Sequence, residues 1–118
     1  MKYLMFICVS ETTDPEKAVE VGAAMQAGLP AWFEEVERRG VRIMGHALAD
    51  PSTATTVRVR DGETLLSDGP FAETKEFVGG FDILDCRDLD EAIEIAALHP
   101  VSWYHSIEVR PFAASETG

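Results

Sequence analysis

The chain of 118 residues is 46% hydrophobic and 26% charged, which is typical of one globular domain with its own core. A formal net charge of −11 argues against a nucleic-acid partner, because affinity for phosphates depends on lysine and arginine. No apolar run reaches the ~20 residues of a membrane span, which argues against a membrane partner. The apolar N-terminus runs into Glu11 and Asp14 rather than a small-residue cleavage site, so we expect a cytoplasmic protein without a signal peptide.

The first third of the chain predicts a strand and a long helix. Residues 2–9 are aromatic, β-branched or otherwise apolar on both faces of a strand. Asp14 followed by Pro15 is typical of a helix start, and apolar residues then recur at steps of three and four. Gly40 is typical of a helix end. Pro30 should kink this helix or split it into two.

The middle of the chain predicts a strand over residues 41–48 and then a hairpin. In the strand, simple alternation places Arg42, Met44 and His46 on one face. The hairpin signal is Asp61-Gly62, which separates two strand-like segments and is typical of a two-residue turn.

The last third predicts a strand, a helix and a final strand. Residues 77–86 form the first of these strands, with a bulge expected at Gly79-Gly80. Asp88 has the spacing of a helix cap, and Pro100 should end that helix. Residues 104–110 then alternate as a strand.

This order of elements predicts an α+β protein with a ferredoxin-like βαββαβ fold and an inserted β-hairpin. We expect a single domain over residues 1–112, followed by a polar tail of residues 113–118. Such a sheet has helices on one face only, yet the first strand is apolar on both faces. The simplest cover for the second face is another copy of the chain, so we expect a two-fold symmetric homodimer. The alternative is that the long helix wraps around the sheet.

One block of the sequence carries a family resemblance. Residues 68–76, Asp-Gly-Pro-Phe-Ala-Glu-Thr-Lys-Glu, with Gly79-Gly80-Phe81 after them, resemble the signature of the DGPF proteins, a branch of the YCII-related family. The resemblance implies the dimeric α+β barrel fold over nearly the whole chain. It also implies a possible enzymatic role, which a His–Asp pair in a cleft has suggested for the family, and a regulatory context near extracytoplasmic sigma factors. Position 82 departs from the pattern, because Asp82 stands where an aromatic or apolar residue is expected.

The candidate catalytic residues are Asp68 and His46. Asp68 is a candidate general acid or base if it lies in a cleft beside a charged neighbour such as His46 or Lys75. The alternative is that Asp68 hydrogen-bonds the backbone of its own Asp-Gly-Pro turn. His46 is a candidate proton shuttle if its strand face lines the barrel interior. Otherwise it is a core histidine with satisfied hydrogen bonds.

The candidate ligand-binding residues are Arg58, Phe71, Lys75, Glu76 and Asp82. Arg58 or Lys75 would hold an anionic group of the ligand, and Asp82 would make the pocket more polar. The alternatives are a surface position for Arg58, a core plug for Phe71 and a solvated turn for Lys75 and Glu76. For a histidine outside this set, His99, we expect solvent exposure or an interaction with a helix C-terminus.

The cysteine and histidine pattern excludes the common metal sites. Cys8 and Cys86 lie in apolar strand-like segments, where we expect buried free thiols. No zinc spacing, nucleophile elbow or glycine-rich phosphate loop is present in the sequence. We therefore expect no metal and no cofactor.

Two functions are compatible with these features. The first is a cofactor-independent acid–base enzyme, of the lyase or isomerase kind, that binds a small organic ligand in the barrel pocket. The second is a non-catalytic ligand-binding or regulatory module. Only the first requires catalytic groups that converge on one cavity.

Overall fold

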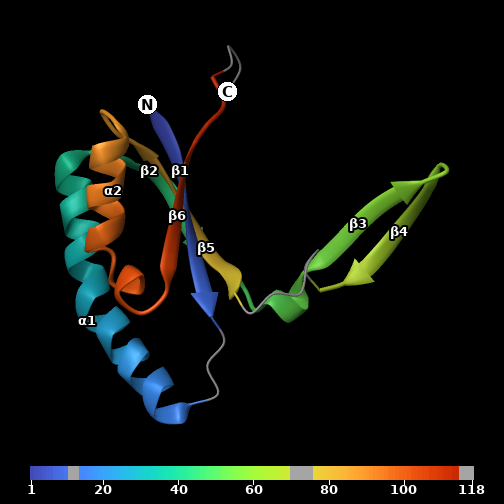
Figure 1. The fold of residues 1–118 in the computed structure, drawn as a ribbon, viewed down its shortest axis with the longest axis horizontal. Helices are drawn as coiled ribbons and strands as arrows, with labels where there is room; N and C mark the ends of the chain where they lie inside the picture. The colour runs from blue at the N-terminus through green and yellow to red at the C-terminus, as the bar shows by residue number, and fades with distance from the viewer. Residues whose placement is uncertain (11–13, 70–75, 115–118) are drawn as a thin grey trace.

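The computed structural model describes residues 1–10, 14–69 and 76–114. A four-stranded antiparallel sheet carries two helices on one face, and a separate two-stranded hairpin projects from the body (Figure 1). The elements in chain order are β1 (Lys2–Ser10), α1 (Pro15–Arg39), β2 (Arg42–Ala47), η1 (Pro51–Thr53), β3 (Thr55–Arg60), β4 (Glu63–Asp68), β5 (Glu76–Asp85), α2 (Leu89–Leu98), η2 (Pro100–Trp103) and β6 (Ser106–Pro111).

The main sheet has the strand order β2-β5-β1-β6, with every neighbouring pair antiparallel. Helix α1 joins β1 to β2, which have β5 between them, and α2 joins β5 to β6, which have β1 between them. This is the split βαβ arrangement, so the α+β fold with an inserted hairpin that the sequence predicts is confirmed.

The long helix α1 begins and ends where its sequence indicates. The side chain of Asp14 accepts hydrogen bonds from the backbone N–H groups of Glu16 and Lys17, at 3.0 and 3.4 Å. Gly40 ends the helix in the left-handed conformation, with φ of 67°. The helix is continuous through the exposed Pro30, so a split into two helices does not occur.

The core lies between the sheet and the two helices. The largest fully buried side chains include Trp32 of α1, Tyr3 and Met5 of β1, Leu84 of β5 and Ile95 of α2. The indole N–H of Trp32 donates to the carbonyl oxygen of Ile95 at 3.0 Å and so joins the helices. This packing uses only one of the two apolar faces of β1.

The sheet face away from the helices, which we call the open face, is apolar but only partly covered. Leu4 and Phe6 of β1 and Ile83 of β5 are half-buried there, and Met44 of β2 is 48% exposed. The two described helices both lie on the opposite face (Figure 1).

The hairpin β3–β4 makes its main contacts between its own two strands. Asp61 and Gly62 both have positive φ, 51° and 76°, as the predicted tight turn requires. The projection of the hairpin raises the radius of gyration to 16.5 Å, against about 13.5 Å for a compact chain of this length. Its apolar side chains, among them Val57 and Leu66, are therefore exposed.

Among the residues that the structure describes, no helix combines the length and the apolar character needed to cross a membrane.

Candidate functional site

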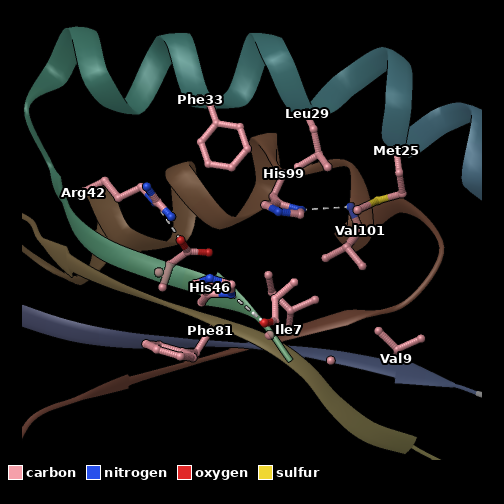
Figure 2. Close-up of a pocket in the computed structure, with 15 residues that line it drawn as sticks. Ile7, Val9, Met25, Leu29, Phe33, Arg42, His46, Phe81, His99 and Val101 are labelled. Carbon is pink, nitrogen blue, oxygen red and sulfur yellow. Dashed lines mark hydrogen bonds and ion pairs between the residues drawn. The ribbon is translucent and has the colours of Figure 1, made fainter. Parts of the chain in front are cut away.

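A cavity of about 430 Å³ lies between the helix-facing side of the sheet and the helices (Figure 2). Most of its wall is apolar, with four charged or titratable side chains among the lining residues. The lining consists of Ile7, Val9, Met25, Leu29, Phe33, Arg42, Gly45, His46, Ala47, Gly79, Gly80, Phe81, Asp82, His99 and Val101.

The cavity exists because small residues occupy the floor of the sheet. Gly45 lies opposite Asp82 across the β2–β5 ladder, and Ala47 lies opposite Gly80. These positions face the helices, where larger side chains fill the rest of the layer. The carboxylate of Asp82 occupies the space over Gly45. With only a methyl group at position 47 and a hydrogen at position 80, the helices cover a space that no large side chain fills.

Asp82 is the polar centre of the floor. It is 4% exposed, and its Oδ1 accepts a hydrogen bond from Nε of Arg42 at 2.8 Å. Its second oxygen makes no hydrogen bond within the described residues. Every fully buried side-chain oxygen or nitrogen in that part of the chain has a partner, so this oxygen must face open space, which is the cavity. Burial raises the pKa of Asp82, and Arg42 opposes that increase only in part.

Arg42 lies between Asp82 and an aromatic ring of α1. Its guanidinium carbon is 5.0 Å from the ring centroid of Phe33, a cation–π distance. Figure 2 shows the guanidinium beneath the Phe33 ring, with its ion pair to the strand below drawn as a dashed line. Arg42 therefore holds one carboxylate oxygen of Asp82 and leaves the other available.

Arg42 reaches this position through a β-bulge. The register shifts between Arg42 and Met44, so Arg42 lies opposite Leu84, on the helix-facing side, while Met44 lies opposite Ile83 on the open face. The predicted common face for Arg42, Met44 and His46 is therefore wrong.

His99 is the second polar group in the wall and is 2% exposed. Its Nδ1 accepts a hydrogen bond from the backbone N–H of Val101 at 3.1 Å. Its ring meets Trp32 edge to face, with 4.8 Å between centroids. Burial lowers the pKa of His99 to about 4, so the imidazole is uncharged at neutral pH. The expectation of a solvent-exposed His99 is wrong, because the chain turns inward at Pro100 and places the ring under α1.

Of the two predicted catalytic residues, His46 borders the cavity and Asp68 does not. His46 is exposed, its Nδ1 lies 2.8 Å from the carbonyl oxygen of Ala47, and it pairs in register with Phe81. The ring of Phe81 lies on the side of the sheet away from the helices (Figure 2). Asp68 is the exposed last residue of β4, opposite Thr55 in the hairpin. The structure thus does not bring Asp68 and His46 together at this cavity.

Among the predicted ligand-binding residues, Asp82 lines the cavity. Arg58 lies in the middle of β3, opposite Leu65. Glu76 begins β5 and accepts a hydrogen bond from the hydroxyl of Ser10 at 3.4 Å. Neither is among the lining residues. Phe71 and Lys75 lie outside the described residues, and their predicted roles remain predictions.

Two groups of this site, Arg42 and His99, are missing from the predicted set. The face of Arg42 depends on a bulge that the sequence does not mark. The burial of His99 depends on how α1 passes over η2. Asp82, which departs from the family pattern, and His46 are the two predicted residues that border this cavity.

A sequence profile of the YCII-related domain matches residues 1–113. The chain belongs to the YCII-related family. This assignment confirms the one made from residues 68–81.

Two further similarities are informative. The uncharacterized protein R00369 of Rhizobium meliloti (strain 1021) is 44% identical over 75 residues, which are 60% of this chain and 59% of that relative. The chain thus matches about three fifths of the length of that relative. Among solved structures, 5-chloro-2-hydroxyhydroquinone dehydrochlorinase (TftG) from Burkholderia phenoliruptrix AC1100, in complex with 2,5-dihydroxybenzoquinone, aligns over 100% of this chain and 99% of its own. The TM-score is 0.50 and the identity 14%, so this likeness shows the fold.

Proposed function

We propose that this protein binds a small, mostly apolar organic molecule in the cavity and exchanges a proton with it through Asp82. The observation that carries the proposal is a buried carboxylate with one oxygen held by Arg42 and the other open to an apolar space. The chemistry would be lyase-like or isomerase-like, without a cofactor.

The environment of Asp82 suits acid–base work. A carboxylate whose pKa is raised by burial takes and returns a proton nearer to neutral pH than an exposed one. Arg42 fixes the orientation of the carboxylate, so little rearrangement is needed when the proton moves. The apolar walls from Ile7, Leu29 and Phe33 favour a ligand with a hydrocarbon ring.

The structural neighbour guides the choice of ligand. That neighbour is named as a dehydrochlorinase of a chlorinated hydroxyhydroquinone, and its structure holds 2,5-dihydroxybenzoquinone. We therefore propose phenols and hydroxyquinones as the first class of ligands for this cavity. A hydroxyl group on such a ring would bond the open oxygen of Asp82.

The predicted roles of Asp68 and His46 remain an alternative. Asp68 stands in the projecting hairpin, where a second copy of the chain could bring it to a site that one copy lacks. A cytoplasmic homodimer is therefore part of the proposal. A non-catalytic binding or regulatory module is the second candidate function. In such a module the Arg42–Asp82 pair would hold the ligand without exchanging a proton with it.

The test is a thermal-shift screen of phenols and hydroxyquinones with three proteins: wild type, Asp82→Asn and Asp68→Asn. We expect ligands that raise the melting temperature of the wild type and of Asp68→Asn, but not of Asp82→Asn. Asparagine keeps an oxygen for Nε of Arg42 and should preserve the fold. Loss of the shift in Asp68→Asn alone would place the site at the hairpin.

Ligands found in the screen are then incubated with the wild-type protein, and the products are followed by NMR. Turnover that depends on Asp82 supports the enzyme, and binding without turnover supports the binding module. The proposal is wrong if no ligand of this class binds any of the three proteins.

A further inference from the structure

The two nitrogens of His99 have different surroundings. Nδ1 accepts a hydrogen bond from the N–H of Val101, so Nδ1 carries no proton. In a neutral imidazole the proton must then be on Nε2. The fold thus fixes one tautomer of this ring.

Nε2 of His99 faces the cavity. It makes no hydrogen bond within the described part of the chain, where every fully buried side-chain nitrogen or oxygen has a partner. It must therefore touch open space, and the open space beside this ring is the cavity. Figure 2 shows the Val101 bond on one side of the ring and the other nitrogen turned toward the middle of the cavity.

The capping role of His99 does not by itself require an imidazole. His99 caps the short helix η2 through Nδ1, and an asparagine or serine would make the same kind of bond. The imidazole adds an N–H on its far side and an edge-to-face contact with Trp32 that fixes the plane of the ring.

We infer that His99 determines ligand specificity, because its Nε2–H is a fixed hydrogen-bond donor that selects ligands with an uncharged oxygen acceptor. The inference rests on the proposed function and assigns the second polar contact of the same ligand. Asp82 accepts from a hydroxyl group, and His99 donates to a carbonyl or similar oxygen. The two contacts together orient a ring in an otherwise apolar space.

The charges around the cavity support an uncharged ligand group at His99. Burial keeps the imidazole neutral, with a pKa of about 4. Arg42 and Asp82 are paired with each other. A carboxylate placed against His99 would lose its hydration without gaining an opposite charge.

The first experiment requires no ligand. Long-range ¹⁵N–¹H NMR of the full chain identifies which nitrogen of each histidine is protonated at pH 7. We expect His99 as the Nε2–H tautomer. A proton on Nδ1 of His99 would overturn the inference.

The second experiment compares two probes of similar shape, 4-hydroxybenzaldehyde and 4-vinylphenol, which share the hydroxyl group and differ in the acceptor oxygen. We expect the wild type to bind the aldehyde about three- to tenfold more tightly, as one additional hydrogen bond allows. His99→Asn retains an acceptor for Val101 and should lose this preference. His105→Asn is the matched control, because Nδ1 of His105 also accepts a backbone N–H, that of Ser10 at 3.2 Å, but lies outside the lining.

The outcomes distinguish a failure of the proposed role of His99 from a failure of the proposed function. Equal affinity of the wild type for both probes, with binding still dependent on Asp82, overturns the role of His99 and leaves the proposed function standing. Absence of binding of both probes by the wild type overturns the role of His99 together with the proposed ligand class. If His99→Asn still prefers the aldehyde, another group donates the hydrogen bond to the aldehyde oxygen, and this result also overturns the inference.

Discussion

Gly45 and Asp82 share one small volume on the helix-facing side of the sheet. They lie opposite each other across the β2–β5 ladder, and a β-carbon on Gly45 would be 1.9 Å from Oδ1 of Asp82. The carboxylate thus occupies the space that a side chain at position 45 would need. The Arg42–Asp82 ion pair depends on this glycine.

Replacement of Gly45 by alanine should therefore disrupt the site and lower stability. The new methyl group would also lie 2.6 Å from the carbonyl oxygen of Phe81, so a rotation of Asp82 alone cannot relieve the overlap. We expect a loss of about 2 kcal/mol in the free energy of unfolding, as is usual for overpacking. Urea denaturation measures this value.

The control for this substitution is Gly22→Ala in α1. No atom lies within 4 Å of a β-carbon at position 22, and alanine is favoured over glycine in a helix by about 0.5–1 kcal/mol. Gly22→Ala should therefore be at least as stable as the wild type. If Gly45→Ala were equally stable, Asp82 could not have the described position.

Removal of Arg42 should make stability strongly dependent on pH. In Arg42→Met the carboxylate of Asp82 loses its partner while it stays buried. We expect a loss of about 3 kcal/mol at pH 7 and a smaller loss near pH 4. The loss shrinks because the pKa of Asp82, which burial already raises, rises further without Arg42, and the acid form carries no charge.

Arg38→Met is the control for Arg42→Met. The side chain of Arg38 is 67% exposed and pairs with Glu35 on the surface of α1, where such pairs contribute about 0–1 kcal/mol. Equal effects of the two substitutions across the pH range would contradict a buried Arg42–Asp82 pair.

His99 should destabilise the fold on acidification. Its pKa is lowered from 6.5 to about 4 in the folded chain, so the unfolded chain binds a proton more readily between these values. The neutral imidazole of His99 therefore makes its full contribution to folding stability above pH 6.5, and this contribution is lost as the pH falls toward 4. We expect the free energy of unfolding to fall by about 3 kcal/mol across this range because of His99.

This contribution is measured by difference, with urea denaturation of the wild type and His99→Asn at several pH values. The difference should shrink steadily between pH 6.5 and 4. Asp82 acts in the opposite direction, since its raised pKa favours the folded state at acidic pH, but it is present in both proteins. A constant difference over this range would mean that His99 is not a buried neutral imidazole.

The fold could be predicted from sequence because its determinants are local. Asp14 and Gly40 bound α1, and Asp61-Gly62 makes the turn of the hairpin. The order of strands and helices then leaves few possible arrangements of the sheet.

The site could be predicted only in part, because its determinants are not local. Asp82 departs from the residue that the family resemblance implies at position 82, and the structure places it in the cavity. The side of the sheet on which Arg42 lies depends on a bulge between β2 and β5. The burial of His99 depends on a contact with Trp32, which is 67 positions away in the chain. Neither fact follows from spacing along the sequence.

The open face and the hairpin lead to the last prediction, that the protein is a homodimer. An isolated two-stranded hairpin is at best marginally stable in water. The hairpin β3–β4 nevertheless has few contacts with the rest of the chain, and its Leu66 is 67% exposed. The open face is apolar as well, so a second copy could cover both surfaces. Light scattering after size exclusion should give the mass of two chains.

Leu66→Glu should then weaken the dimer by at least about tenfold, since a buried, unpaired carboxylate at an interface costs more than 1.4 kcal/mol. Val19→Glu is the control, because Val19 is 72% exposed on α1, away from both surfaces. A wild type that remains monomeric at every concentration would rule out the dimer and with it the delivery of Asp68 by a second copy. A dimer that tolerates Leu66→Glu would place the interface on the open face alone, because a hairpin buried by the partner could not accept that charge.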